Sequence, residues 1–93
     1  MFTGIIETVG EVEQIKKEGN NIIFTIKSKI SSELKIDQSL SHDGVCLTVV
    51  EKTESTHSVV AIKETSLKSN VKEWKVGTLI NLERAMKLGD RLD

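Results

Sequence analysis

The sequence predicts an all-β domain of about six strands that close into a barrel. The β-branched residues are abundant and proline is absent, which favours strands. Strand-like segments recur at intervals of about 8–12 residues, a spacing typical of sandwiches and small barrels. Closure into a barrel is expected because a small open sheet leaves two unpaired edges. We find no low-complexity tract, linker or internal repeat, so the 93 residues indicate one small domain.

The expected strands cover residues 5–15, 22–26, 38–42, 45–50, 57–63 and 78–83. In the first of these the apolar alternation is out of phase between Val9 and Val12, with Gly10 between them. A glycine at such a phase change predicts a β-bulge or a tight barrel corner. Residues 28–35 and 66–74 predict one or two short helical turns, neither long enough to form a layer.

Charge and cysteine content exclude several classes of function. Thirteen basic against fourteen acidic residues, with no basic block, lack the electrostatic footprint of a nucleic-acid-binding protein. One cysteine and two histidines form neither an internal disulfide nor a good metal site, so we expect no metal and a cytoplasmic protein. No apolar run approaches the roughly 18 residues of a membrane span. Residues 1–6 lack the basic start of a signal peptide.

The Asp43-Gly44 pair between two strand-like segments predicts a tight hairpin, because both central residues of a type I′ turn need positive φ. Directly opposed side chains share a face, and faces alternate along each strand. One face of the hairpin then carries Ser39, Ser41, Cys46 and Thr48. The other carries Leu40, His42, Val45, Leu47 and Val49. The apolar set is expected to fill the barrel, and the small uncharged set to face a ligand or a second subunit.

Cys46, the single cysteine, has three interpretations: a small semi-buried residue, a nucleophile or a metal ligand. A nucleophilic thiol needs a cation or a helix terminus to lower its pKa, and the residue predicted opposite Cys46 is only Ser41. His42 lies on the opposite face in this register, which disfavours a Cys–His dyad within one chain. A dyad formed between two chains stays open.

Three other features have plain structural interpretations. His57 is expected on the solvent face of its strand. Trp74 is expected to cover one end of the barrel, since a large aromatic side chain commonly caps a small core. Glu83 and Arg84 are interpreted as an exposed ion pair, worth under about 1 kcal/mol.

Four stretches of the chain resemble the riboflavin synthases of the α-chain type, in the same order and spacing. They are MFTGIIE (residues 1–7), GVCLTV (44–49), Glu64-Thr65, and Val76-Gly77 with NLERA (81–85). The resemblance implies two tandem six-stranded Greek-key barrels in the whole enzyme, each binding one 6,7-dimethyl-8-ribityllumazine. It also implies a trimer in which two lumazines exchange a four-carbon unit to give riboflavin and a diaminopyrimidine, without a cofactor.

This chain resembles the first of the two barrels. Residues 1–93 are therefore expected to be an N-terminal lumazine-binding barrel, with residues 1–84 as its core and 85–93 as the start of a linker to a second barrel. Met86 and Leu88 are expected on a contact surface. Alone, the domain is expected to be weakly active or inactive and to form a homodimer. A non-catalytic lumazine or flavin carrier is the alternative function, and a barrel without any ligand is a third interpretation.

The resemblance also implies the residues of the site. Those expected to bind lumazine or riboflavin are Gly4, Ile5, Ile6, Cys46, Leu47, Thr48, Val60, Ala61, Ile62, Lys63, Glu64 and Thr65. Phe2 matches an aromatic residue at a subunit contact. Candidates for assisting proton transfer are Ser39, Ser41, His42 and Cys46, and the sequence does not choose among them.

Overall fold

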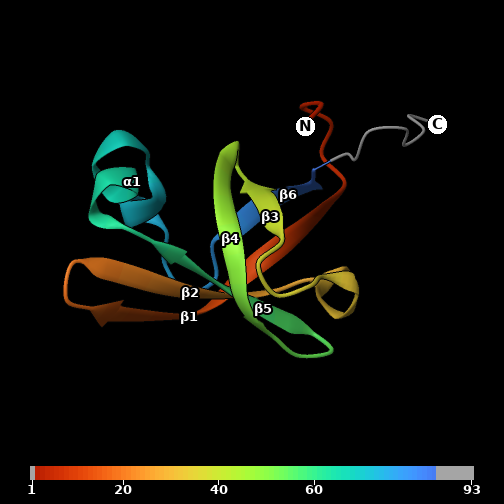
Figure 1. Ribbon diagram of the computed structural model, residues 1–93, viewed down its shortest axis with the longest axis horizontal. Helices are drawn as coiled ribbons and strands as arrows, with labels where there is room; N and C mark the ends of the chain where they lie inside the picture. The colour runs from red at the N-terminus through yellow and green to blue at the C-terminus, as the bar shows by residue number, and fades with distance from the viewer. Residues whose placement is uncertain (1, 86–93) are drawn as a thin grey trace.

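The six expected strands are present in a computed structural model that describes residues 2–85. They are β1 (Thr8–Glu18), β2 (Asn21–Lys27), β3 (Ser39–His42), β4 (Val45–Lys52), β5 (Thr56–Ala61) and β6 (Leu79–Arg84). They pair in the closed order β1-β2-β5-β4-β3-β6, and every pairing is antiparallel (Figure 1). The chain passes to a non-adjacent strand after β2 and again after β5, which is a Greek-key order. The predicted fold is confirmed.

Three short helical segments connect the strands: η1 (Ser31–Glu33), α1 (Lys63–Lys68) and η2 (Val71–Glu73). The turns predicted in 28–35 and 66–74 are confirmed as η1 and η2. The strand expected to reach residue 63 instead ends at Ala61, because α1 begins at Lys63. None of the helices in the described part of the chain is long and apolar enough to cross a membrane. The predictions for Met86, Leu88 and most of the linker concern positions outside the described residues.

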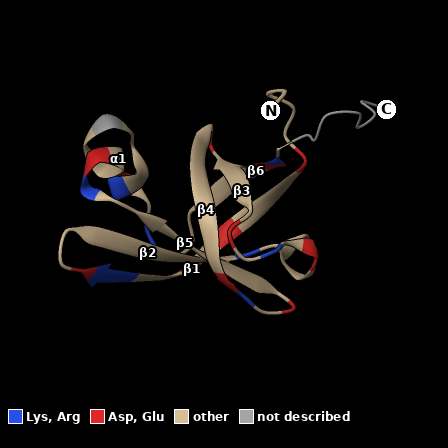
Figure 2. Cartoon of the chain, viewed as in Figure 1, with Lys and Arg blue, Asp and Glu red and all other residues tan. Residues whose placement is uncertain are grey.

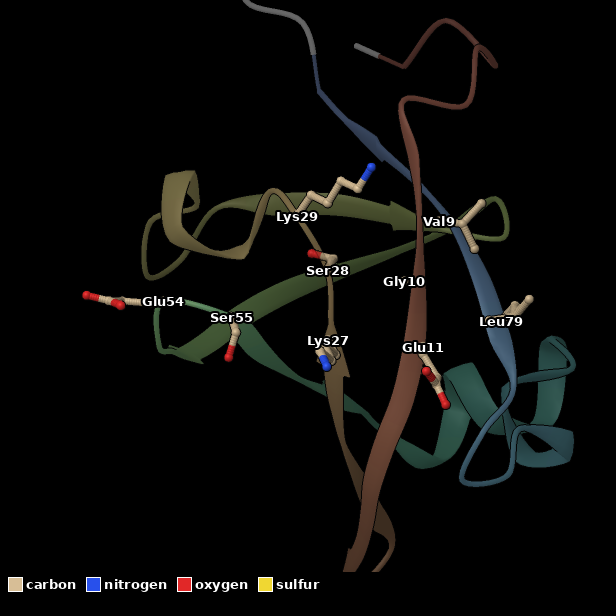
Figure 3. A pocket seen from close by; sticks show the side chains of 9 residues that line it. All are labelled: Val9, Gly10, Glu11, Lys27, Ser28, Lys29, Glu54, Ser55 and Leu79. Atoms are coloured by element: carbon tan, nitrogen blue, oxygen red, sulfur yellow. The ribbon is translucent and has the colours of Figure 1, made fainter.

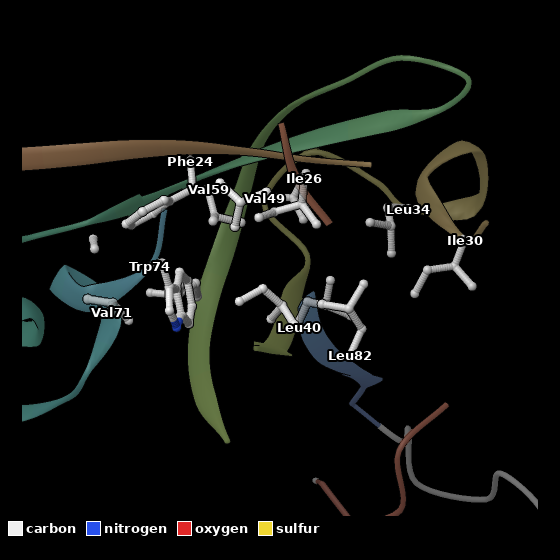
Figure 4. Packing of buried hydrophobic residues seen from close by; sticks show 14 residues of the cluster. Phe24, Ile26, Ile30, Leu34, Leu40, Val49, Val59, Val71, Trp74 and Leu82 are labelled. Atoms are coloured by element: carbon white, nitrogen blue, oxygen red, sulfur yellow. The ribbon is translucent and has the colours of Figure 1, made fainter. Parts of the chain in front are cut away.

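The core is a single cluster of side chains that point inward from all six strands (Figure 4). Helical segments close its two ends. At one end lie Ile30 and Leu34, the residues on either side of η1. At the other end lie Val71, the first residue of η2, and Trp74, the residue after it. The Trp74 ring is buried and meets Phe24 edge to face, with ring centroids 5.0 Å apart. The prediction that Trp74 covers a barrel end is confirmed.

Gly10 lies in the part of β1 that pairs with β6, one residue before β1 begins to pair with β2. It pairs with Ile80, while the next residue, Glu11, pairs with both β2 and β6. A Cβ atom on Gly10 would lie 2.6 Å from Ile26 Cγ2 and 2.9 Å from Leu82 Cδ1. Gly10 is therefore the predicted barrel corner, and the β-bulge lies further along β1, between residues 12 and 14.

The two halves of the chain have the same plan, so the expectation of no internal repeat is wrong at the level of structure. The order β1-β2-η1-β3 recurs as β4-β5-η2-β6 with α1 added before η2, and there is a register shift in β1 and another in β4. The turns after η1 and η2 are closed alike. The backbone N–H of Lys35 donates to Gln38 Oε1 over 2.9 Å, and that of Lys75 donates to Thr78 Oγ1 over 2.9 Å. Different side chains make the same bond, which hides the repeat in the sequence.

Candidate ligand-binding face

The β3–β4 hairpin has the predicted turn and register. Asp43 and Gly44 have φ values of 51° and 84°, as a type I′ turn requires. The pairs are Ser39 with Thr48, Leu40 with Leu47, Ser41 with Cys46, and His42 with Val45. The turn is fixed to β6, because the Asn81 N–H donates to Asp43 Oδ1 over 2.7 Å and the Asp43 N–H donates to the Asn81 carbonyl over 2.8 Å.

The predicted division of the hairpin into two faces is confirmed. Leu40, His42, Leu47 and Val49 are buried inside the barrel. We call the opposite set, Ser39, Ser41, Cys46 and Thr48, the outer face of the hairpin. Cys46 and Thr48 are exposed and Ser39 is half-buried, whereas Ser41 is buried. The interpretation of Cys46 as semi-buried is therefore wrong. Figure 2 shows no charged residue along β3 or the adjoining half of β4.

The outer face continues onto β5 and the start of α1. Val49 pairs with Val59, and both side chains are buried. By alternation, their neighbours Thr48 and Val60 lie side by side on the outside. Ile62, just before α1, keeps 50% of its surface exposed. A row of small polar groups is thus bordered by aliphatic side chains.

The predicted ligand-binding residues do not all reach this face. Leu47 and Ala61 have buried side chains that belong to the core. Lys63 and Glu64 are exposed at the start of α1, and Thr65 is half-buried. Next to them the Ser66 hydroxyl oxygen is buried without a hydrogen-bond partner among the described residues, an unsatisfied group that sequence reasoning missed.

The N-terminal arm, which we define as residues 3–7, is attached beside the outer face. Glu83 of β6 is paired with Ser41 of β3, and its carboxylate accepts three hydrogen bonds from the arm. The donors are the Thr3 N–H, the Thr3 hydroxyl at 2.6 Å and the Gly4 N–H at 3.0 Å. These bonds, those from Thr3 first, hold the pKa of the Glu83 carboxyl below its usual value.

The far end of the arm is held by the next residue of β6. The Arg84 Nε donates to Glu7 over 3.0 Å, and a second guanidinium nitrogen reaches Glu33 over 3.3 Å. The hydrogen bond to Arg84 lowers the pKa of Glu7. The interpretation of Glu83 and Arg84 as partners is therefore wrong, because each binds the arm instead. Between the two anchors Ile5 and Ile6 keep 67% and 54% of their surfaces exposed.

His42 lies inside the barrel, separated from the other three candidates for proton transfer. Its Nδ1 is 2.9 Å from the Leu40 carbonyl, which can only accept, so Nδ1 carries the proton. In the neutral ring Nε2 then accepts from His57 Nε2 over 3.0 Å. His57 Nδ1 in turn accepts from the Ser31 hydroxyl over 3.1 Å, and Ser31 contacts the Ser28 hydroxyl. The expectation of a surface position for His57 is wrong.

Both imidazole rings are neutral at pH 7. Burial lowers the pKa of His42 to about 4, although the hydrogen bond to Leu40 opposes that shift. Burial, with a smaller repulsion from His42, lowers the pKa of His57 to about 3. The pair stabilises the interior as neutral hydrogen-bonded rings, and neither ring reaches the outer face.

A cavity of about 480 Å³ lies elsewhere, where β1 and β2 separate beside the β4–β5 hairpin (Figure 3). Its lining residues are Val9, Gly10, Glu11, Lys27, Ser28, Lys29, Glu54, Ser55 and Leu79. None of the residues predicted to bind ligand belongs to it. Its lining contains both acidic and basic side chains, and this combination indicates no particular class of ligand.

The sequence and the fold of this chain are similar to those of known proteins. The lumazine-binding domain profile matches residues 3–85. Riboflavin synthase of Bacillus subtilis (strain 168) is 39% identical over 92 residues, which are 98% of this chain and 43% of that enzyme. Riboflavin synthase of Saccharomyces cerevisiae is 36% identical over 94 residues, covering 92% of this chain and 40% of that enzyme. The chain thus spans less than half the length of these relatives.

Solved structures share the fold. The crystal structure of LumP complexed with 6,7-dimethyl-8-(1'-D-ribityl) lumazine aligns with a TM-score of 0.86 at 24% identity, covering 100% of this chain and 52% of LumP. LumP complexed with riboflavin gives a TM-score of 0.87, also at 24% identity, covering 100% of this chain and 51% of LumP. The fold is common to these proteins, and the sequence match extends over nearly every described residue. The chain belongs to the lumazine-binding domain family.

Proposed function

We propose that this chain binds 6,7-dimethyl-8-ribityllumazine or riboflavin on the outer face of the hairpin. The observation that carries the proposal is an uncharged row of hydroxyl and thiol groups bordered by exposed aliphatic side chains. Binding sites for small organic ligands combine apolar surface with a few well-placed polar groups. Ile5, Ile6 and Ile62 supply apolar surface for a flat ring system. Ser39 and Thr48 offer hydroxyl groups for ring carbonyls or the ribityl chain.

The proposed reaction needs two such barrels. In this proposal a pair of barrels brings two lumazines into contact. The 7-methyl group of one lumazine loses a proton to give a delocalised carbanion, which attacks C7 of the other. Much of the rate enhancement then comes from proximity. Ser39, Ser41 and Cys46 remain the candidates for assisting proton transfer, and His42 is not proposed for that role because its side chain lies on the inner side of the barrel.

Without a second barrel, the domain is proposed to pair with a copy of itself and to have weak or no synthase activity. Phe2, half-buried at the base of the arm, is proposed as a subunit contact. Sedimentation at micromolar concentration is expected to show a dimer of the 10.3 kDa chain. A monomer alone would contradict this assembly, and a trimer is expected only for the two-barrel protein.

Riboflavin titration tests the binding site. Saturable quenching of riboflavin emission is expected on adding the wild-type protein. Cys46→Phe places a bulky ring on the outer face and is expected to weaken binding at least about tenfold, since a blocked face costs on the order of 1.4 kcal/mol or more. Val76→Phe, at an exposed aliphatic residue outside that face, is the matched control and should bind as the wild type does. Equal affinity of the two variants would contradict the proposed site.

Turnover separates the enzyme from a carrier. A protein with its second barrel restored is expected to convert the lumazine to riboflavin, which is followed by absorbance. Tight binding of the lumazine by that protein without any riboflavin would favour the non-catalytic carrier instead.

A further inference from the structure

We propose that Glu83 is a positioning residue for ligand binding, because its carboxylate holds the N-terminal arm in the shape that presents Ile5 and Ile6. The inference rests on the proposed function, since the arm matters only if the ligand lies on the outer face. Glu83 itself touches no ligand in this proposal. It acts through the backbone of Thr3 and Gly4.

The hydrogen bonds at Glu83 determine the path of the arm rather than merely attaching it. One carboxylate oxygen accepts from both the N–H and the hydroxyl of Thr3, and the other accepts from the Gly4 N–H. The Thr3 hydroxyl oxygen also accepts the Ile5 N–H over 3.1 Å. Gly4 has a φ of 84°, a value that a residue without a Cβ adopts freely. The carboxylate thus binds polar groups of two successive residues, Thr3 and Gly4, and the second of these has a left-handed backbone conformation.

The arm is held at both ends by consecutive residues of one strand. Glu83 binds its beginning, while Arg84 forms an ion pair with Glu7 at its end. The Glu7 N–H also donates to the Leu82 carbonyl over 2.8 Å. The aliphatic residues between the anchors are exposed, so the arm gains little from burying them. Its polar anchors therefore determine its conformation, and its apolar side chains stay available to a ligand.

The strand pairing brings this anchor next to the proposed site. Glu83 is opposite Ser41, and Ser41 is opposite Cys46, so the carboxylate and the thiol are two strands apart on one side of the barrel. A ligand lying over Cys46 would lie within reach of the arm. Loss of the carboxylate frees the beginning of the arm, and ligand binding must then order it again at an entropic cost.

The first test needs no ligand. In the wild-type protein, the amide resonances of Thr3 and Gly4 are expected to shift together as Glu83 is protonated at low pH. In Glu83→Gln that shared titration is expected to vanish, because the ionisable acceptor is gone. Glu54→Gln, which removes a carboxylate from the β4–β5 turn, is the matched control and should keep it. Amides of Thr3 and Gly4 that show no titration in the wild type would overturn the inference.

The second test measures riboflavin affinity and thermal stability together. Glu83→Ala is expected to weaken binding by about tenfold, the effect of re-ordering one or two residues, with a melting temperature close to that of the wild type. Glu83→Gln, which keeps an acceptor oxygen, should bind with intermediate affinity, and Glu54→Gln should bind normally. If Glu83→Ala fails to fold, Thr3→Val removes only the hydroxyl bonds and carries the same expectation in weaker form.

The two tests separate the two ideas. Normal riboflavin affinity in folded Glu83→Ala would overturn the role of Glu83 in ligand binding and leave the proposed function standing. A wild-type protein that binds neither lumazine nor riboflavin would overturn the proposed function and, with it, the ligand-positioning role. The amide titration alone would then decide whether Glu83 holds the arm.

Discussion

His42 and His57 share a hydrogen bond inside the barrel, where both residues have an exposed fraction of 0%. In the unfolded chain their pKa values return to 6.5, whereas in the folded chain they are about 4 and about 3. Below pH 6.5 the unfolded chain therefore binds protons that the folded chain does not. The free energy of unfolding must fall as the pH falls through this range.

The histidine pair predicts a pH dependence in a range where most carboxylates have not yet titrated. Between about pH 6.5 and pH 5, the free energy of unfolding is expected to fall with a slope that approaches about 1.4 kcal/mol per pH unit for each histidine. In His57→Gln, which keeps polar atoms but cannot titrate, the slope should be smaller. Urea unfolding at several pH values measures it. A free energy of unfolding independent of pH would contradict the burial of the pair.

The side of the strand on which a residue lies is predictable from the sequence where apolar and polar residues alternate regularly. The turn at Asp43-Gly44 is enough to place His42 on the inward side of its strand. The position of His57 is not predictable in this way, because β5 contains the consecutive valines Val59 and Val60, which give no phase to the apolar pattern. The hydrogen bond between the two histidines joins β3 and β5, and no local signal in the sequence indicates it.

Among the elements, the β3–β4 hairpin is the most predictable, because its turn needs two residues at positive φ. The N-terminal arm is the least predictable. Its anchors, Glu83 and Arg84, come from 77 to 80 positions further along the chain. Exposed hydrogen bonds between such distant residues leave no periodic pattern, so the sequence alone suggests that Glu83 and Arg84 pair with each other and does not indicate their bonds to the arm.

Two substitutions of Asp43 test the contribution of the hairpin turn to stability. Asp43→Ala loses the acceptor for the Asn81 N–H and places a Cβ residue without local hydrogen bonding at a φ of 51°. It is expected to reduce the free energy of unfolding by about 1–3 kcal/mol. Asp43→Asn keeps an acceptor oxygen and tolerates the same backbone, so its effect should stay within about 0.5 kcal/mol. Urea unfolding compares the two, and equal losses would contradict the account of the turn.

For the whole molecule, the barrel class is predictable from strand spacing and composition, but the likeness of its two halves is not. Each half has a register shift in its first strand. Each half also has a turn closed by a side-chain hydrogen bond, but the acceptor is Gln38 in one and Thr78 in the other. Gly10 lies at a barrel corner, one residue before β1 passes from pairing with β6 to pairing with β2. Its close contacts with both neighbouring strands cannot be inferred from a single glycine in the sequence.

Gly10→Ala tests that corner. The added Cβ would meet Ile26 and Leu82 well inside contact distance, with the Lys27 carbonyl oxygen 3.1 Å away. Relief requires the buried Ile26 and Leu82 side chains to shift in a packed core, so a loss of about 1–3 kcal/mol in the free energy of unfolding is expected. Gly19→Ala is the control, because a Cβ there meets nothing within 4 Å and only the φ of 60° opposes it. A smaller loss for Gly10→Ala than for Gly19→Ala would contradict the proposed crowding.

β6 is the last strand of the barrel, and it lies between the first strand and the third. During synthesis, neither β1 nor β3 has this neighbour until residue 84 has left the ribosome. Without β6 the order β1-β2-β5-β4-β3 has two open edges, and open edges are the parts of a sheet most prone to pair with another chain. Docking of β6 therefore both closes the barrel and, through Glu83 and Arg84, supplies the groups that hold the arm.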